Sequence, residues 1–144
     1  MAAQLTDIAD ALGTTSGRSR TVLEFTRTMK QVVDRAKQPD FTAASWAPLA
    51  EFVATDDFHR VGPFKDAYDW PTYVAFLTGW APTSHWECSL RRITEVGNLV
   101  YLELEERMAP GDSANAANSA SVYEFDDTGD IRRLDVYLQF PSPD

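Results

Sequence analysis

The 144-residue sequence is poor in cysteine and histidine and has no long apolar run. Its single cysteine, Cys88, excludes a domain held together by internal disulfides. No apolar stretch approaches the roughly 18 residues that a membrane span requires, so we expect no membrane contact. Asp7 and Asp10 lie where a signal peptide needs a basic start and an apolar stretch. These features predict a cytoplasmic domain.

Positive charge is also scarce. The chain has 13 Lys and Arg residues against 22 Asp and Glu residues, a formal net charge of −9. Because this surface repels phosphate backbones and no basic cluster offsets it, we expect no nucleic-acid partner. The hydrophobic share of 44% and the charged share of 24% are typical of globular domains. The composition therefore predicts one folded domain with an ordinary core.

Helical spacing of apolar residues dominates the first 82 positions. A short helix is expected within an N-terminal extension over residues 1–18. Longer helices are expected from about 19 to 36, from 42 to 52 and from 70 to 81, the last with Asp69 as its N-cap and Pro71 in its first turn. Residues 52–63 between the second and third of these helices predict one short strand.

From residue 83 onward the apolar period changes from 3.6 to 2, which predicts strands at 85–95, 99–108, 121–125 and 131–140. Gly97-Asn98 is a hairpin signal, and residues 109–119 are expected to form a long loop. Helices followed by antiparallel strands predict an α+β fold. Such a curved sheet, wrapped against three helices, would enclose a cone-shaped cavity within a single domain over residues 19–144.

Four segments carry a resemblance to a known superfamily: VLEF at 22–25, ATDDFHRVG at 54–62, GNLVYLELEE at 97–106 and FDDTGDIRRLDVYLQ at 125–139. Together they resemble the nuclear transport factor 2-like superfamily, and within it the SnoaL-like and ketosteroid isomerase-like proteins. The resemblance implies a conical, cystatin-like α+β barrel that forms a homodimer through its convex sheet face. Its members include isomerases, epoxide hydrolases, cyclases, dehydratases and non-catalytic binding proteins.

Strand alternation assigns residues to the two faces of the sheet. The face expected to line the cavity carries Trp86, Cys88, Leu90, Val100, Leu102, Leu104, Glu106, Leu134, Val136 and Leu138. Glu106 is then a carboxylate on an apolar face, where an ionised group is costly unless paired. It is either a functional acid/base or a residue at an open strand end that reaches water. Cys88 fits a small core residue better than a nucleophile.

His59 is the second candidate for acid/base chemistry. The sequence HRVG at 59–62 aligns with the D-P-V-G of ketosteroid isomerases, whose aspartate is the proton-abstracting base. Histidine also transfers protons near neutral pH, although alternation with Phe58 turns His59 outward if Phe58 lies inside. His85 is expected at the surface. Limonene epoxide hydrolases use an Asp–Arg–Asp set that corresponds here to Leu104, Glu106 and Val136, and the closing-strand aspartate of SnoaL cyclases is Val136, so neither mechanism is expected.

The sequence therefore predicts an isomerase, cyclase, dehydratase or hydrolase acting on a small apolar molecule such as a polyketide, steroid or terpenoid. His59 and Glu106 are the predicted catalytic pair, and no cofactor or metal is required. The predicted substrate-binding residues are Tyr73, Trp86, Leu102, Leu104, Val136 and Leu138. The alternative is a non-catalytic ligand-binding or dimeric interaction protein, which the aliphatic interior favours.

Overall fold

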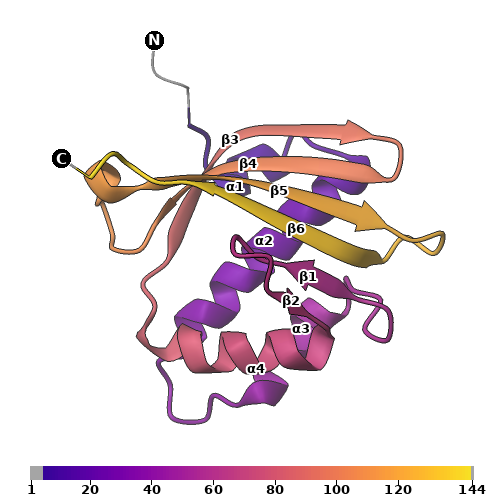
Figure 1. The fold of residues 1–144 in the computed structure, drawn as a ribbon, viewed down its shortest axis with the longest axis horizontal. Coiled ribbons are helices and arrows are strands. Elements are labelled where there is room, and N and C mark those ends of the chain that lie inside the picture. Colours follow the sequence, from indigo (N-terminus) through magenta and orange to yellow (C-terminus); the bar gives the residue numbers. More distant parts are fainter. Residues whose placement is uncertain (1–4, 144) are drawn as a thin grey trace.

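The structure, a computed structural model, describes residues 5–143. Its main feature is a curved, open sheet of six strands in the order β2-β1-β6-β5-β4-β3 (Figure 1). The strands are β1 (His59–Val61), β2 (Ala67–Tyr68), β3 (Glu87–Val96), β4 (Leu99–Arg107), β5 (Ala117–Phe125) and β6 (Ile131–Gln139). Only the β1–β6 pair is parallel within this sheet.

Helices α2 (Gly17–Arg35), α3 (Ala47–Ala50) and α4 (Trp70–Trp80) lie on one side of this sheet, and α1 (Ile8–Leu12) lies beside β3 (Figure 1). Three short 3-10 turns complete the described part: η1 (Ala43–Trp46), η2 (Ala81–Thr83) and η3 (Ser113–Asn115). The predicted α+β fold is confirmed as an open cone. No helix within residues 5–143 is long and apolar enough to span a membrane.

The helices form where capping and apolar spacing predict them. In α4, Asp69 Oδ1 accepts a hydrogen bond from the Thr72 backbone N–H at 2.9 Å, and Pro71 occupies the first turn. The apolar stripe of α2 is buried from Val22 to Val33. The helix expected over 42–52 is split into η1 and α3, because Pro48 has no N–H with which to continue a regular helix.

Burial confirms the predicted faces of the central strands. On β4, Val100, Leu102 and Leu104 are buried, whereas Tyr101 between them is exposed. The hairpin at Gly97-Asn98 is also confirmed, since Val96 pairs with Leu99 across it and Gly97 has a φ of +58°.

Three features of the sheet differ from the sequence prediction. The sequence does not predict the two-residue strand β2, which pairs with β1. Residues 117–119 belong to β5 and not to the loop, because pairing with β4, and from Asn118 also with β6, holds even this polar, small-residue segment extended. In β3, a bulge between Leu90 and Arg92 shifts the register. Ile93 therefore pairs with Leu102 and is partly buried against the core.

The beginning of the chain covers part of the outer edge of β3. Thr6 forms an isolated antiparallel bridge with Leu90, with N···O distances of 2.9 and 2.7 Å. Ile8, Ala11 and Leu12 of α1 are buried in the common core. Residues 1–4 of the predicted extension lie outside the described residues.

Because Leu102 is 1% exposed at the centre of β4, we expect Leu102→Ala to lower the free energy of unfolding by about 2–5 kcal/mol. Val96→Ala, at an exposed position beside the hairpin turn, is expected to change it by less than about 0.5 kcal/mol. Urea titration followed by tryptophan fluorescence measures both values. Equal losses in the two variants would contradict this account of the core.

Candidate functional site

The concave face of the sheet and helices α2 and α4 enclose two adjoining hollows. The inner one has a volume of about 120 Å³ and the outer one, near the C-terminal ends of β4 and β6, about 300 Å³. Both are lined by Met29, Arg60, Tyr73, Trp86, Glu106 and Val136. The two hollows therefore form one site, called the cone cavity below. Its polar residues Arg60, Tyr73 and Glu106 line both hollows.

Small side chains on β5 account for the space. Ala117, Ser119 and Ser121 share the face of β5 that points towards the helices, and Ser119 lies between Leu104 of β4 and Leu138 of β6. Protein interiors normally leave few voids. Three small side chains at alternate positions on one concave face leave space that larger side chains would fill. The Ser119 hydroxyl is buried with no hydrogen-bond partner in the described part of the chain.

Glu106 lies on the wall of this cavity near the end of β4. Its Oε1 accepts a hydrogen bond from the indole Nε1–H of Trp86 at 2.8 Å. Within residues 5–143, Glu106 joins no ion pair, and its Oε2 has no hydrogen-bond partner. One carboxylate oxygen is thus fixed by the protein while the other is available to a ligand.

Tyr73 and Arg60 face the same space from α4 and β1. Tyr73 is buried, and its ring stacks on Phe58 with centroids 5.9 Å apart. Burial raises the pKa of the Tyr73 phenol, and the nearby charge of Arg60 partly offsets this rise. The Arg60 guanidinium lies 5.3 Å from the Tyr73 ring centroid and 5.9 Å from that of Phe76.

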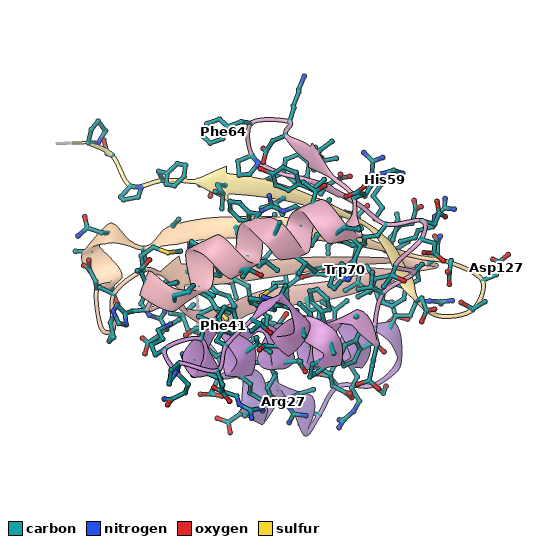
Figure 2. The ribbon with its side chains drawn as sticks, turned by 90° about the horizontal axis from the view of Figure 1, so that it is seen from below. Arg27, Phe41, His59, Phe64, Trp70 and Asp127 are labelled. Carbon is teal, nitrogen blue, oxygen red and sulfur yellow. The ribbon has the colours of Figure 1, made fainter. Side chains whose placement is uncertain are left out.

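Sequence reasoning missed Arg60, although the signal was present. Phe58 is 1% exposed, and strand alternation puts Arg60 on the same face as Phe58. His59 consequently points outward, into a separate surface hollow that it shares with Asp57, Glu124, Arg132 and Arg133 (Figure 2). The structure does not bring His59 and Glu106 together.

The predicted substrate-binding residues are mostly on the cavity wall. Tyr73, Trp86, Leu104, Val136 and Leu138 line one or both hollows. Leu102 is buried in the core and lines neither of them. His85 is exposed, as expected. No group of three or more histidine, cysteine, aspartate or glutamate side chains that could hold a metal occurs in residues 5–143.

No protein-family model and no curated protein matches the sequence, but solved structures match the fold. A nuclear transport factor 2-like protein of unknown function from Cytophaga hutchinsonii aligns with a TM-score of 0.59 at 15% identity, covering 87% of this chain and 92% of that one. A second such protein, from Mesorhizobium loti, aligns with 0.59 at 16% identity, covering 87% and 96%. The chain has the nuclear transport factor 2-like fold.

A steroid delta-isomerase from Pseudomonas aeruginosa shares this fold, with a TM-score of 0.58 at 17% identity, covering 86% of this chain and 81% of that one. At such identities the likeness concerns the nuclear transport factor 2-like fold alone. It confirms the resemblance inferred from the sequence at the level of architecture, and the chemistry has to be argued from the residues of the cone cavity.

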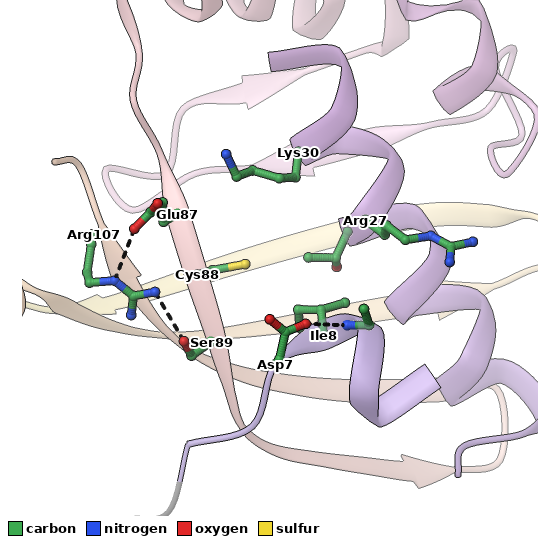
Figure 3. Close-up of a pocket in the computed structure, with 10 residues that line it drawn as sticks. Asp7, Ile8, Arg27, Lys30, Glu87, Cys88, Ser89 and Arg107 are labelled. Atoms are coloured by element: carbon green, nitrogen blue, oxygen red, sulfur yellow. Dashed lines mark hydrogen bonds and ion pairs between the residues drawn. The ribbon is translucent and has the colours of Figure 1, made fainter. Parts of the chain in front are cut away.

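A third hollow lies between α1, α2 and β3 (Figure 3). Of its charged residues, Arg107, Glu87 and Lys30 form ion pairs and Asp7 caps α1, whereas Arg27 forms no ion pair within residues 5–143. Arg107 contacts Glu105 at 2.8 Å, Ser89 at 3.1 Å and Glu87 at 3.7 Å, and Lys30 contacts Asp34 at 2.6 Å. The cone cavity, which holds charged groups short of partners, is the stronger candidate.

Cys88 lies at this third hollow, and in the sheet it is paired directly with Glu106. Burial, and secondly the Glu106 charge, raise the pKa of the Cys88 thiol to about 12. A thiol with this pKa carries very little thiolate at neutral pH, and thiolate is the nucleophilic form. The sequence-based interpretation of Cys88 as a small structural residue fits this environment.

We expect Cys88 in the folded protein to react with 4,4′-dithiodipyridine at neutral pH about 10³-fold more slowly than in the urea-unfolded chain, since its pKa is about 12 against 9.0. Because the unfolded thiol loses its proton first, this group also lowers the free energy of unfolding as the pH rises above 9.0. Cys88→Ala should remove that pH dependence. Equal reaction rates in the two states would contradict the assignment.

Proposed function

We propose that the cone cavity catalyses proton transfer on a small, largely apolar carbonyl compound, with Glu106 as the general base and acid. The observation that carries this proposal is the Trp86–Glu106 hydrogen bond, which holds a carboxylate in an otherwise mainly apolar cavity. Retaining an ion there is costly unless it has a use. A structural neighbour that is a steroid delta-isomerase supports an isomerase among the possible reaction types.

The reaction divides between two side chains. Glu106 Oε2 takes a proton from the carbon next to the carbonyl, and the bonding electrons move onto the carbonyl oxygen as an enolate. The phenol of Tyr73, kept protonated because burial raises its pKa, donates a hydrogen bond to that oxygen. Glu106 then returns the proton to the same carbon or, in an unsaturated ketone, to another carbon, which completes an isomerisation.

Glu106→Gln is expected to lower catalysis about 10²–10⁴-fold, because the amide cannot accept the proton. The measurement is deuterium incorporation from D₂O next to the carbonyl of 2-tetralone and 3-methylcyclohexenone, read by mass spectrometry. Glu105→Gln, one residue away on the opposite face of β4, is the matched control and should exchange like the parent protein.

His59→Ala tests whether His59, the other predicted catalytic residue, takes part in the reaction. In the proposed mechanism His59 takes no part, so this variant should retain full exchange activity. Loss of exchange in His59→Ala together with full activity in Glu106→Gln would overturn the assignment of the base to Glu106.

The aliphatic walls of the cone cavity and its single carboxylate favour non-catalytic ligand binding as the second candidate function. In that case apolar ketones bind but do not exchange, and Glu106→Gln leaves their affinity unchanged. Ligand affinity, measured by quenching of tryptophan fluorescence in the parent protein and in Glu106→Gln, separates this candidate from the first.

We further propose that two copies pair through the convex face of the sheet. Tyr101 and Tyr137 are 39% and 60% exposed there, and they flank Val122 and Ala120, their neighbours on β5. Arg92 pairs with Glu103, and Arg133 with Asp135. With these charges neutralised, the aromatic and aliphatic strip between them is suited to contact its own copy.

Tyr137→Asp should therefore convert a dimer into a monomer in sedimentation velocity experiments, because it buries a carboxylate in the shared strip. Phe64→Asp, which changes an even more exposed aromatic residue on the turn between β1 and β2, is the control and should remain dimeric. A parent protein that sediments as a monomer at every concentration would contradict this proposal.

A further inference from the structure

The Arg60 guanidinium is partly buried beside the Tyr73 phenol and lacks a full set of hydrogen-bond partners. The side chain is 14% exposed, and its contact with Asp66 Oδ2 measures 3.7 Å, which is longer than a hydrogen bond. Its Nε is buried and has no hydrogen-bond partner within residues 5–143. Since a guanidinium carries five N–H donors, this arrangement leaves hydrogen-bonding capacity for a ligand.

The protein holds this guanidinium in a defined position. The rings of Tyr73 and Phe76 lie within 6 Å of it. Gly62 leaves it room, because a Cβ at that position would lie 2.7 Å from Arg60 Nη1 and 2.6 Å from Asp66 Oδ1. A cation fixed in this way loses little conformational freedom when it binds an anion.

We propose that Arg60 binds the carboxylate of the substrate, so that the cone cavity selects apolar monocarboxylic acids, oxo acids among them, over neutral molecules. This inference rests on the proposed function, since it names the class of molecule on which Glu106 acts. Guanidinium and carboxylate match in shape and form paired, charge-assisted hydrogen bonds. The carboxylate at Arg60 then orients the rest of the molecule relative to Glu106.

The charges of the cavity favour a monoanion. Among the described residues, Arg60 and Glu106 are the only Asp, Glu, Lys, Arg or His side chains lining the two hollows, and they form no ion pair with each other. The guanidinium has one long ion pair, the 3.7 Å contact with Asp66, so it has capacity for one further carboxylate and not for a more highly charged anion. A phosphate dianion would add an uncompensated charge beside Glu106 in a chain that already has a net charge of −9.

An apolar rim around the outer hollow could contact the hydrocarbon end of such an acid. Phe76, Met108 and Phe140 line the outer hollow and are 45%, 59% and 69% exposed. Phe64, 88% exposed, projects from the turn between β1 and β2 (Figure 2). Exposed apolar side chains gathered around one opening indicate a binding surface. The hydrocarbon part of the acid can therefore extend from Arg60 through the outer hollow to this rim.

The test compares 4-phenylbutyrate, indole-3-butyrate and decanoate with their neutral primary amides, titrated by calorimetry. We expect the acids to bind the parent protein at least about tenfold more tightly than the amides, in line with one charge-assisted pair. Arg60→Gln should bring this ratio close to one. Arg133→Gln, on the outer face of β6, is the control and should leave it unchanged. Equal affinities in the parent protein, or no binding of any acid at millimolar concentration, would overturn the proposal.

A second variant guards against misfolding of Arg60→Gln. Gly62→Ala keeps the arginine but crowds the tips of the Arg60 and Asp66 side chains, so that their contact must shift. It should therefore reduce the acid/amide ratio. Gly79→Ala is its matched control, since a Cβ there meets nothing within 4 Å. An unchanged ratio in both Arg60→Gln and Gly62→Ala overturns the proposal.

Glu106→Gln separates this inference from the proposed function. It removes the base but not the guanidinium, so the acid/amide ratio should persist while deuterium exchange is lost. A preference for acids without any exchange in the parent protein would support Arg60 as the anion site and contradict catalysis by Glu106. Exchange of neutral ketones without a preference for acids would support catalysis by Glu106 and contradict Arg60 as the anion site.

Discussion

The curved sheet imposes the constraint on which the rest of this structure depends: its concave apolar face has to be covered. Helices α2 and α4 provide the cover, and their large side chains meet Leu104 and Leu134 across the interior. Beneath α2 and α4, filling is incomplete where β5 presents Ala117, Ser119 and Ser121. The cavity therefore follows from side-chain volumes on one central strand, and its outer part lies near the C-terminal ends of β4 and β6.

Within that space the chain places one basic and one acidic side chain, Arg60 on β1 and Glu106 on β4, without pairing them with each other. Each is supported by aromatic groups: the indole of Trp86 holds Glu106, and the rings of Tyr73 and Phe76 hold Arg60. Direct pairing would satisfy both charges and close the site to ligands. Because they are separated, both charges can interact with a ligand. The protein is then less stable than if they were paired, a cost that is typical of functional sites.

Much of this arrangement was predictable from local patterns, and the exceptions have physical causes. Strand alternation identified Glu106 and four aliphatic or aromatic neighbours because β4 and β6 are regular and one face of each is buried. The same rule applied from Phe58 would have identified Arg60, but the alignment of HRVG with another family's motif directed attention to His59. The extent of β5 and the bulge after Leu90 depend on pairing with neighbouring strands, which no local pattern records.

The bridge between Thr6 and Leu90 has a further consequence for how this protein behaves in a crowded solution. An uncovered edge strand offers unpaired N–H and C=O groups to any other extended chain. Here the beginning of the chain occupies part of the β3 edge, while the opposite edge, β2, is only two residues long. The segment before α2 thus covers part of an edge to which other chains could add a strand. It should limit aggregation as well as stabilise the cone.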